Sequence, residues 1–497
     1  MSSPTADLGS PQLARLLGPW RVVNSTAAPG RHPARQALAD RIRSLILDGR
    51  IAVGARLPAE RQLSETLQVS RTTVTAAYAL LVEQGYAAAR RGSGTFTALP
   101  ERLLARSTGG WQYSDDPDVL DLTCAAPPAP LTELRAATAW AAERLPLTGV
   151  RTYLPYGLPE LREAIAERYT GRGLPTRPDQ ILVTAGAQGA ITLVARLLLR
   201  TGDRVLVEGP SFPNALDSLT ASRARLSPVP LDEAGWLDPA TGRMPLAQAA
   251  QRLSPRLVYT IPHFHNPTGL LQPPEAAATL ARATRRAGAW LLADETITDA
   301  ALDVPIPAPF AAAVSAADTE RLLVCGSLGK SFWGGIRIGW LRAPSRVVHE
   351  LAAARASLDL ASPVLDQLIG VAVLREGMGV PDDGRARIRA NREALETLLS
   401  AAIPDWTWQT PPGGHCLWVR LADGEESTSL VYRAGTHGLL LQSGPRFSAD
   451  PGTHERFLRL PYTQDPDVLR DAVHRLAAAR TGLGPVRTTD TRRDLVA

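Results

Sequence analysis

The sequence predicts a winged helix-turn-helix domain at residues 35–98, followed by an α/β domain with a mostly parallel sheet at residues 120–480. Two observations predict this fold class. Residues 35–98 place three helical segments before two short strand-like runs. From residue 120 onward, apolar strand-like runs alternate with alanine-rich helical stretches. A chain of 497 residues is long enough for two or three such domains.

Composition narrows the class of protein. Hydrophobic residues make up 44% of the chain and charged residues 21%, which is typical of a globular protein with a large core. The net charge of +5 permits a polyanionic partner. No apolar run approaches the ~18 residues of a membrane span, so no membrane association is expected. The three cysteines are too few and too scattered for a disulfide framework, which predicts a cytoplasmic location.

The N-terminal domain shows clear helix and turn signals. Residues 35–51 carry apolar side chains on one helical face, and a second helix follows Pro58. A third helix starts at Ser70, which suits an N-cap, and ends near Gly85. The Gly-Ser-Gly turn at 92–94 joins two short strands. This order is that of a winged helix-turn-helix.

In that geometry the third helix enters the DNA major groove with its N-terminal residues. Here these are Arg71, Thr72 and Thr73, whose side chains can meet phosphates and base edges. The hairpin tip would lie along the DNA backbone or in the minor groove. The residues expected at the tip are Arg90, Arg91 and Gly92. The alternative is a small helical cap with solvated arginines.

The stretch LPAERQLSETLQVSRTTVTAAYALLVEQGY, at residues 57–86, resembles the GntR family of transcription factors. The resemblance implies that Arg61 and Arg71 contact double-stranded DNA, with Thr72 and Thr73 beside them. Residues 1–34 are expected to be an N-terminal tail.

The large domain is separated from the first by a predicted linker at 99–119, which has no clean period and contains Gly-Gly and Asp-Asp-Pro. Its strand candidates are almost continuously apolar, as in a parallel sheet covered on both faces. A mobile tail is expected at 481–497. The strand candidates are residues 181–185, 204–208, 256–262, 289–295 and 321–327.

Polar and small residues follow several of these strands. GAQGA after the first strand suits a helix N-terminus that holds a phosphate. Asn266 lies in NPTG after the third, Asp294 ends the fourth, and Lys330 and Arg337 follow the fifth. Because ligands in open α/β sheets bind at the carboxyl ends of strands, we expect these groups to converge on one rim.

Lys330 is the only lysine in the chain, although lysine and arginine together number 54. A lysine can lose its proton and attack a carbonyl to form a Schiff base, which a guanidinium cannot do. The position therefore predicts covalent chemistry. The alternative is an ordinary surface residue.

The motifs NPTG at 266–269 and SLGK…R at 327–337 resemble the fold-type I, class I/II aminotransferases that depend on pyridoxal 5′-phosphate, over residues 121 to 475. The resemblance implies this cofactor and a smaller C-terminal α/β subdomain. Lys330 would bond to the cofactor aldehyde, Asp294 would pair with the pyridinium nitrogen, Asn266 would bond the ring oxygen and Phe212 would stack on the ring. The implied phosphate contacts are Ala187, Gln188, Ser327, Arg337 and, in a partner subunit, Tyr153.

Arg459 aligns with the arginine that grips the carboxylate of a substrate or effector. His263 and His265 alternate in a way that suggests a metal, but no companion ligand is evident in the sequence. We therefore expect packing or hydrogen bonding for both and no metal site.

One departure from the aminotransferase pattern bears on activity. Active members place a tyrosine two or three residues after the aspartate, whereas Thr296 and Ile297 stand here. Ala125 also replaces a glycine that approaches the substrate. These changes leave cofactor binding intact and disfavour efficient transamination.

The two domains in this order resemble the MocR subfamily of GntR-type regulators. The resemblance implies a homodimer whose DNA affinity responds to pyridoxal phosphate or to an amino compound reacting with it. A working aminotransferase with a DNA-binding module is the main alternative, and a scaffold that only dimerises is a third.

Overall fold

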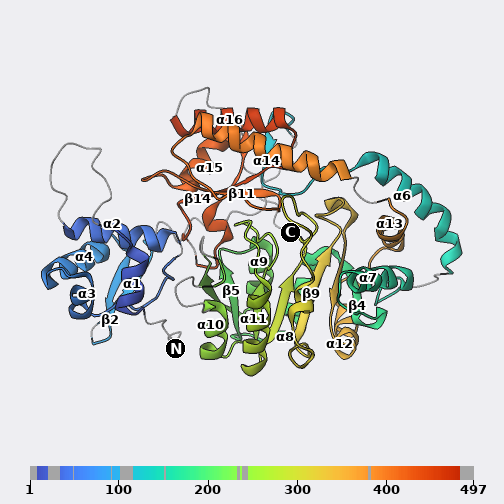
Figure 1. Ribbon diagram of the computed structural model, residues 1–497, viewed down its shortest axis with the longest axis horizontal. Helices are drawn as coiled ribbons and strands as arrows, with labels where there is room; N and C mark the ends of the chain where they lie inside the picture. The colour runs from blue at the N-terminus through green and yellow to red at the C-terminus, as the bar shows by residue number, and fades with distance from the viewer. Residues whose placement is uncertain are drawn as a thin grey trace.

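The computed structural model describes residues 8–20, 34–48, 50–90, 92–100, 116–149, 153–231, 235–237, 244–378, 382–450 and 452–481. A small N-terminal domain, blue in Figure 1, lies beside a large domain built around a central sheet. The C-terminal segments, orange and red, form a further layer next to that sheet. Within these ranges no helix is long and apolar enough to span a membrane.

The N-terminal domain is a winged helix, as predicted. Ser70 caps the third helix by accepting a hydrogen bond from the Thr73 N–H at 3.1 Å. The hairpin strands pair antiparallel. The elements are α2 (Ala34–Leu47), α3 (Glu60–Leu67), α4 (Arg71–Glu83), β1 (Ala87–Arg90) and β2 (Gly94–Thr97).

An additional helix, α1 (Ser10–Leu17), corrects the expectation of a tail over residues 1–34. Leu13, Leu17 and Trp20 are buried in the same core as α2 and α4. Leu13 and Leu17, four residues apart, lie on one face of α1, and Trp20 just past the helix packs into the same core, which explains why the segment folds onto the domain. Residues 101–115 of the expected linker and 482–497 of the expected tail lie outside the described ranges.

The large domain contains a seven-stranded sheet, which confirms the predicted fold class. Only β10 runs antiparallel to its neighbours, and the other pairs are parallel. The carboxyl ends of the parallel strands therefore meet along one edge. In sheet order the strands are β4 (Ile181–Ala185), β10 (Ile338–Arg342), β9 (Leu322–Ser327), β8 (Trp290–Asp294), β7 (Leu257–Thr260), β5 (Arg204–Gly209) and β6 (Arg225–Pro230).

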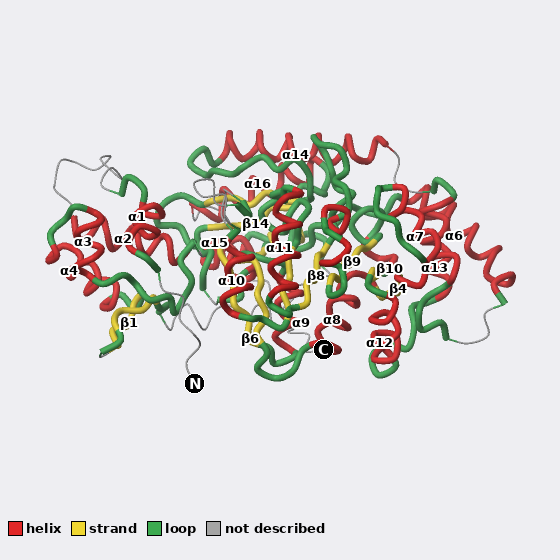
Figure 2. Tube along the Cα trace, turned by 60° about the horizontal axis from the view of Figure 1, so that its bottom comes forward, coloured by secondary structure: helices red, strands yellow, loops and turns green. Residues whose placement is uncertain are grey.

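Helices cover both faces of this sheet, and Figure 2 shows its yellow strands lying among them. Successive residues of β4 illustrate why, since Leu182 packs into one apolar core while Ile181 and Val183 pack into the other. One core contains α8 (Gly186–Leu198), α9 (Pro213–Ala221) and α12 (Ser345–Arg355). The other contains α6 (Leu131–Arg144), α7 (Pro159–Gly171), α10 (Pro245–Leu253), α11 (Pro274–Arg286) and α13 (Val364–Arg375).

A smaller C-terminal subdomain has its own three-stranded sheet and apolar core. Its strands are β11 (Cys416–Arg420), β14 (Phe457–Pro461) and β13 (Gln442–Ser443), with α14 (Asp382–Ala402), α15 (Ser427–Thr436) and α16 (Pro466–Thr481). A short parallel pair, β3 (Leu120–Asp121) with β12 (Leu439–Leu440), ties in the start of the large domain. The 3-10 turns are η1 (Leu145–Thr148), η2 (Pro178–Gln180), η3 (Phe310–Ala313), η4 (Ala316–Asp318), η5 (Gly334–Ile336) and η6 (Gly444–Phe447).

The winged helix touches this subdomain through the C-terminal end of α2. Asp48, just past the helix, forms an ion pair with Arg420 of β11 at 3.2 Å. Both views place the N-terminal domain beside the β14 and α15 side of the large domain. We call this contact region the seam.

Candidate functional site

A cavity of about 670 Å³ lies at the carboxyl ends of the central strands. Its volume is within the range of small-molecule sites. Tyr153 is not on its wall and is 67% exposed. The predicted residues that do line the cavity are Ala187, Gln188, Phe212, Asn266, Asp294, Ser327, Lys330, Arg337 and Arg459.

Lys330 follows β9 and points its amine at the cavity's inner wall. Its Nζ donates a hydrogen bond to the Ala125 carbonyl at 2.7 Å. Burial lowers the pKa of Lys330, and the positive charge of Arg459 adds to this effect. A lowered pKa favours the neutral amine, which is the form that attacks a carbonyl carbon.

Asp294 ends β8 and is 4% exposed. One carboxylate oxygen accepts the Tyr259 hydroxyl at 2.7 Å, and the other accepts the Thr296 N–H at 3.0 Å and hydroxyl at 2.5 Å. No described residue supplies a cation within ion-pair distance. A buried carboxylate held by neutral donors is suited to a cationic group brought in by a ligand.

The opposite end of the cavity is built to hold an anion. Helix α8 begins at Gly186, whose φ is +74°, and no described side chain caps it. Arg337 lies across this helix start, donating to the Ala185 carbonyl at 2.8 Å. A Cβ at Gly186 would lie 2.7 Å from the Arg337 Nη2, so only glycine fits. Free N–H groups beside a guanidinium suit a phosphate.

Two predicted phosphate residues have side chains with other partners. The Gln188 amide donates to the Asn214 carbonyl at 2.9 Å and the Ser218 hydroxyl at 2.7 Å. Ser327 donates its hydroxyl to the Ile338 carbonyl at 3.0 Å. Both Gln188 and Ala187 lie in the first turn of α8, so an anion at this helix start would meet their backbone N–H groups rather than the Gln188 side chain.

Arg459, on β14, is a buried cation that forms no ion pair with a described residue. It is 4% exposed, one Nη2 donates to the Thr123 carbonyl, and its Nε has no hydrogen-bond partner among the described residues. Burial lowers its pKa. A guanidinium in this state is poised for an incoming carboxylate.

Among the described residues, few hydrogen-bond donors lie where the ring oxygen of the cofactor is expected. The Asn266 Oδ1 is buried and has no hydrogen-bond partner in the described chain. Thr296 and Ile297 both line the cavity, but the Thr296 hydroxyl is bonded to Asp294 and Ile297 cannot donate. The missing tyrosine is therefore not replaced by either neighbour.

The cavity wall also includes residues that the sequence analysis did not predict, among them His415, Trp333 and Cys124. His415 lies on the wall beside Lys330, and burial lowers its pKa to about 3, so it is neutral. Trp333 and Cys124 also line the cavity. The signal for His415 was the preceding glycine pair, since a Cβ at Gly413 would lie 2.5 Å from the Phe264 ring. The other two carried no motif.

The two alternating histidines are hydrogen-bonded and buried. The His263 Nδ1 lies 2.8 Å from the Thr298 hydroxyl, and the His265 Nδ1 lies 2.9 Å from that of Thr268. The His265 Nε2 lies 3.2 Å from Glu208. Among the described residues no group of three or more metal-type ligands comes together.

The DNA-facing candidates sit on the outside of the small domain. Arg71 and Thr72 are exposed at the start of α4, and Arg71 lies 3.7 Å from Glu60. Arg61 is paired with Glu65 at 3.1 Å. Thr73 is partly buried and its N–H caps onto Ser70.

The hairpin supplies further positive charge. Arg90 stacks over Phe96 at 4.6 Å. Gly92 has a φ of +78°, which the tight turn requires, while Arg91 lies outside the described residues. Arg56 was missed by the sequence analysis and bridges to Phe96 beside the hairpin. Arg56 directly precedes the motif at residues 57–86, and only the folded structure brings it beside the hairpin.

The cavity fits pyridoxal 5′-phosphate. Asp294, a buried carboxylate without a cationic partner among the described residues, suits the protonated ring nitrogen. The uncapped start of α8 with Arg337 suits the phosphate. Lys330, whose pKa is lowered, suits the aldehyde. The residues that carry these three features line one cavity.

Comparisons with known proteins agree with both domains. Residues 118–476 match the family model "Aminotransferase class I and II", and residues 34–97 match "Bacterial regulatory proteins, gntR family". The uncharacterized HTH-type transcriptional regulator YisV of Bacillus subtilis is 26% identical over 90% of this chain and 95% of its own. The probable rhizopine catabolism regulatory protein MocR of Rhizobium meliloti is 29% identical over 63% of this chain and 66% of its own.

Among solved structures, the α-aminoadipate aminotransferase LysN of Thermus thermophilus, complexed with N-(5′-phosphopyridoxyl)-L-leucine, has a TM-score of 0.66 and 25% identity. The match covers 77% of this chain and 97% of LysN. The large domain is thus of the kind that binds pyridoxal 5′-phosphate. The chain belongs to the aminotransferase class I and II family, and its N-terminal GntR domain gives it the architecture of the MocR subfamily of DNA-binding regulators.

Proposed function

We propose that this protein is a transcriptional regulator whose DNA affinity responds to pyridoxal 5′-phosphate or to an amino compound that reacts with it. One observation carries the proposal. A DNA-reading helix is exposed at one end of the small domain, while the end of α2 contacts the same subdomain sheet that carries Arg459. The three-stranded sheet of the C-terminal subdomain therefore lies between a ligand in the cavity and the DNA-binding domain.

When bound, the cofactor supplies an electrophilic aldehyde and an electron-withdrawing ring. The residues of the chain hold it in place. Lys330 would present its amine to the aldehyde, Asp294 would pair with the ring nitrogen, and Arg337 with the start of α8 would hold the phosphate. Arg459 selects amino compounds that carry a carboxylate. Only a ligand that binds two arrangements of the domains with different affinity can shift DNA binding.

We further propose a homodimer in which Tyr153 reaches the cavity of the second copy. Tyr153 is 67% exposed, and Leu147, close to it in the chain, is 79% exposed. Large apolar side chains exposed together are typical of an interface. Light scattering on the full chain measures the mass directly. The cytoplasmic location expected from the cysteine content remains a prediction.

An active aminotransferase is the second candidate, because Lys330, Asp294 and Arg459 line one cavity. Ile297, in place of a hydrogen-bond donor, argues against efficient turnover. The two candidates differ in a simple measurement, which is the number of amino-donor molecules consumed per protein molecule.

DNA binding tests the proposal directly. We expect the protein to bind the DNA upstream of its own gene. The logarithm of the binding constant should fall with the logarithm of the salt concentration, with a slope of about 0.9 for each phosphate neutralised. Arg71→Ala should weaken binding to all sequences, whereas Thr73→Ala should relax preference at one or two bases at a cost of about 1–3 kcal/mol. Arg470→Ala is the matched control, since Arg470 is also exposed and paired with a nearby acid, at 2.5 Å to Asp467.

Adding pyridoxal 5′-phosphate and a carboxylate-bearing amine should change DNA affinity, and Lys330→Ala should blunt the change. Wild-type protein that binds upstream DNA no better than random DNA, yet turns over an amino donor many times, would favour the aminotransferase instead.

A further inference from the structure

A line of packed side chains leaves the cofactor cavity through the small sheet. The Arg459 guanidinium lies 5.0 Å from the centre of the Phe447 ring. Phe447 meets Trp418 edge to face, with centroids 5.5 Å apart at 70°. Trp418 stacks on Phe457, with centroids 5.1 Å apart and planes within 2°. Offset or edge-on aromatic contacts of this size are favourable and geometrically specific.

The line continues across the seam. The Arg420 guanidinium lies 5.8 Å from the centre of the Phe457 ring, and its Nη2 lies 3.2 Å from the Asp48 Oδ2 of the winged-helix domain. Asp48 is 3% exposed, and neither of its oxygens accepts a hydrogen bond from a described residue. Burial raises the pKa of Asp48, and Arg420 is the largest of the charges that oppose this. Arg420 is therefore the main, though not the sole, countercharge of this carboxylate.

The strand register explains why these side chains form one line. Trp418 and Arg420 are two residues apart on β11, and Phe457 and Arg459 are two apart on β14. Side chains at that spacing lie on the same face of a strand. Trp418 pairs directly with Arg459, and Arg420 pairs with Phe457. All four thus share one face, which runs from the cofactor cavity to the seam.

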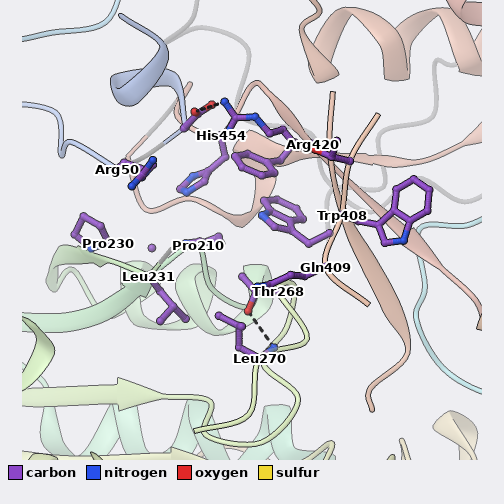
Figure 3. A pocket seen from close by; sticks show the side chains of 15 residues that line it. Arg50, Pro210, Pro230, Leu231, Thr268, Leu270, Trp408, Gln409, Arg420 and His454 are labelled. Atoms are coloured by element: carbon purple, nitrogen blue, oxygen red, sulfur yellow. Dashed lines mark hydrogen bonds and ion pairs between the residues drawn. The ribbon is translucent and has the colours of Figure 1, made fainter. Parts of the chain in front are cut away.

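The line borders a second cavity, of about 400 Å³, shown in Figure 3. Its walls include Arg50 and His454, and the Arg420 ion pair is drawn at its upper edge. Four segments reach both cavities, with Pro210, Thr268, Trp418 and Phe457 at the seam and Phe212, Asn266, Cys416 and Arg459 at the cofactor. Open space beside packed rings lets them change position, which a close-packed core resists.

We propose that this face is a docking surface whose grip on the winged helix depends on the state of Arg459. A carboxylate that binds Arg459 draws the guanidinium from Phe447, which moves Trp418 and Phe457 and changes the hold of Arg420 on Asp48. The end of α2 is then held differently, and the reading helix with it. This inference rests on the proposed function, because it assigns the route by which a ligand reaches the DNA-binding domain.

A double-mutant cycle in the full-length chain tests the route without needing the natural ligand. The variants are Arg459→Gln, Arg420→Gln and the pair, and the readout is amide hydrogen exchange in the peptide covering α2. Independent sites give additive effects, whereas members of one network do not. Additive free energies correspond to fold-changes in exchange rate that multiply. We expect the fold-change of the double variant to differ from the product of the two single-variant fold-changes by at least about threefold. Strict additivity would overturn the route.

Phe447→Leu tests the middle of the line, because it removes a ring between Arg459 and Arg420 while both arginines stay in the sequence. It should lower the non-additivity toward zero. If the non-additivity persists at full size in that background, the aromatic line does not carry it. Should Arg420→Gln fold poorly, Asp48→Asn removes the same ion pair from the other domain and replaces it in the cycle.

Arg480→Gln is the matched control for Arg420→Gln. Arg480 has a similar exposure, 24% against 26%, and a similar position over a ring, 5.9 Å from that of Trp406. Its acidic partners, Asp405 and Glu425, belong to the large domain. It should therefore show no coupling to Arg459 in the α2 readout. Coupling equal to that of Arg420 would mean a general loss of stability and would overturn the proposal.

DNA affinity, measured on the same variants with and without pyridoxal 5′-phosphate, separates the two proposals. Suppose that α2 exchange shows the coupling between Arg459 and Arg420, but that the ligand does not change DNA binding by the wild type. The coupling route would then stand, and the ligand-responsive regulator would be wrong. A ligand effect on DNA binding that Arg420→Gln and Phe447→Leu leave at wild-type size keeps the regulator and rejects the route.

Discussion

Arg459 and Arg420 lie on paired strands of one small sheet, yet their charges are balanced differently. Arg459 faces the cofactor cavity and forms no ion pair with a described residue, whereas Arg420 faces the seam and is paired with Asp48. A buried cation without a partner is costly. Among the described residues, the guanidinium is thus left without an ion-pair partner at the cofactor cavity, and it is paired within the chain where the two domains meet.

Two buried carboxylates, near the ends of β8 and β5, differ in a similar way. Asp294, in the cofactor cavity, is held only by neutral donors. Glu208, outside it, lies 3.2 Å from His265, and that histidine with further donors lowers the pKa of Glu208 despite its burial. Among the described residues, Asp294 at the cofactor cavity is thus left without a cationic partner, whereas Glu208 has His265 beside it.

The largest expected effect concerns covalent capture at the cofactor cavity. Lys330→Arg keeps the positive charge but removes the only side-chain amine in the protein. We expect complete loss of cofactor fixation by borohydride and loss of the yellow colour. Mass spectrometry after reduction measures the bound group. Fixation on any other residue would contradict the assignment of Lys330.

A smaller effect should follow from removing the unbalanced arginine. Arg459→Gln should weaken binding of a carboxylate-bearing amine by roughly 10–100-fold, since a hydrogen bond to a charged group contributes about 1.5–3 kcal/mol. The ligand-free protein should become more stable, because an uncompensated buried charge is gone. Calorimetric titration and urea unfolding measure the two effects. Arg420→Gln, whose cation is already paired, should not show this combination.

Much of the cofactor cavity could be predicted from the sequence, because the motifs lie where strands end. The residues after 181–185, 289–295 and 321–327 meet in one cavity since parallel strands share an edge. The apolar runs themselves identified those strands. Strand β6 was missed because it is a partly exposed edge strand with two prolines, and β10 because it begins directly after the glycine-rich turn that drew attention to Arg337.

The seam could not be predicted in this way. Asp48 and Arg420 belong to different domains, and neither lies in a motif. Their contact depends on how two separately folded parts pack, which no local pattern encodes. Helix α1 was missed for a related reason, since its apolar residues have meaning only against the core that they complete. Local periodicity specifies elements, whereas docking depends on their surfaces.

Acidity gives a further way to compare the two regions. Burial raises the pKa of Asp450, at the seam, to about 6, and the Val53 backbone of the winged helix opposes the rise. A pKa above the ordinary value means that the docked state holds the proton more tightly. Docking should therefore strengthen as pH falls from about 7 toward 4, by at most about 1.4 kcal/mol per pH unit.

Amide exchange of the peptide around Val53, corrected for the intrinsic pH dependence, follows this docking. Asp450→Asn should reduce the pH response, because the asparagine cannot titrate, and Asp48, whose pKa burial also raises, should account for the remainder. Asp467→Asn, at the exposed start of α16, is the control and should leave it unchanged. A wild-type response of the opposite sign would show that another group governs the seam in this range.

The smallest expected effect lies at the ring-oxygen end of the cofactor cavity. Ile297 lines this region, and the Asn266 Oδ1 has no hydrogen-bond partner among the described residues. A tyrosine at 297 would add a donor that stabilises the deprotonated form of the Lys330-bound cofactor. Ile297→Tyr should then move the pH of its visible absorption change downward by about one unit, equivalent to about 1.4 kcal/mol. An absorption titration measures the shift, and Ile297→Phe, which adds the ring without the hydroxyl, is the matched control. Because the change leaves Arg459 and Phe447 untouched, α2 exchange should stay at its wild-type rate. A shift in that rate would mean that the seam responds to any change in the cavity, rather than to the balance of charge at Arg459.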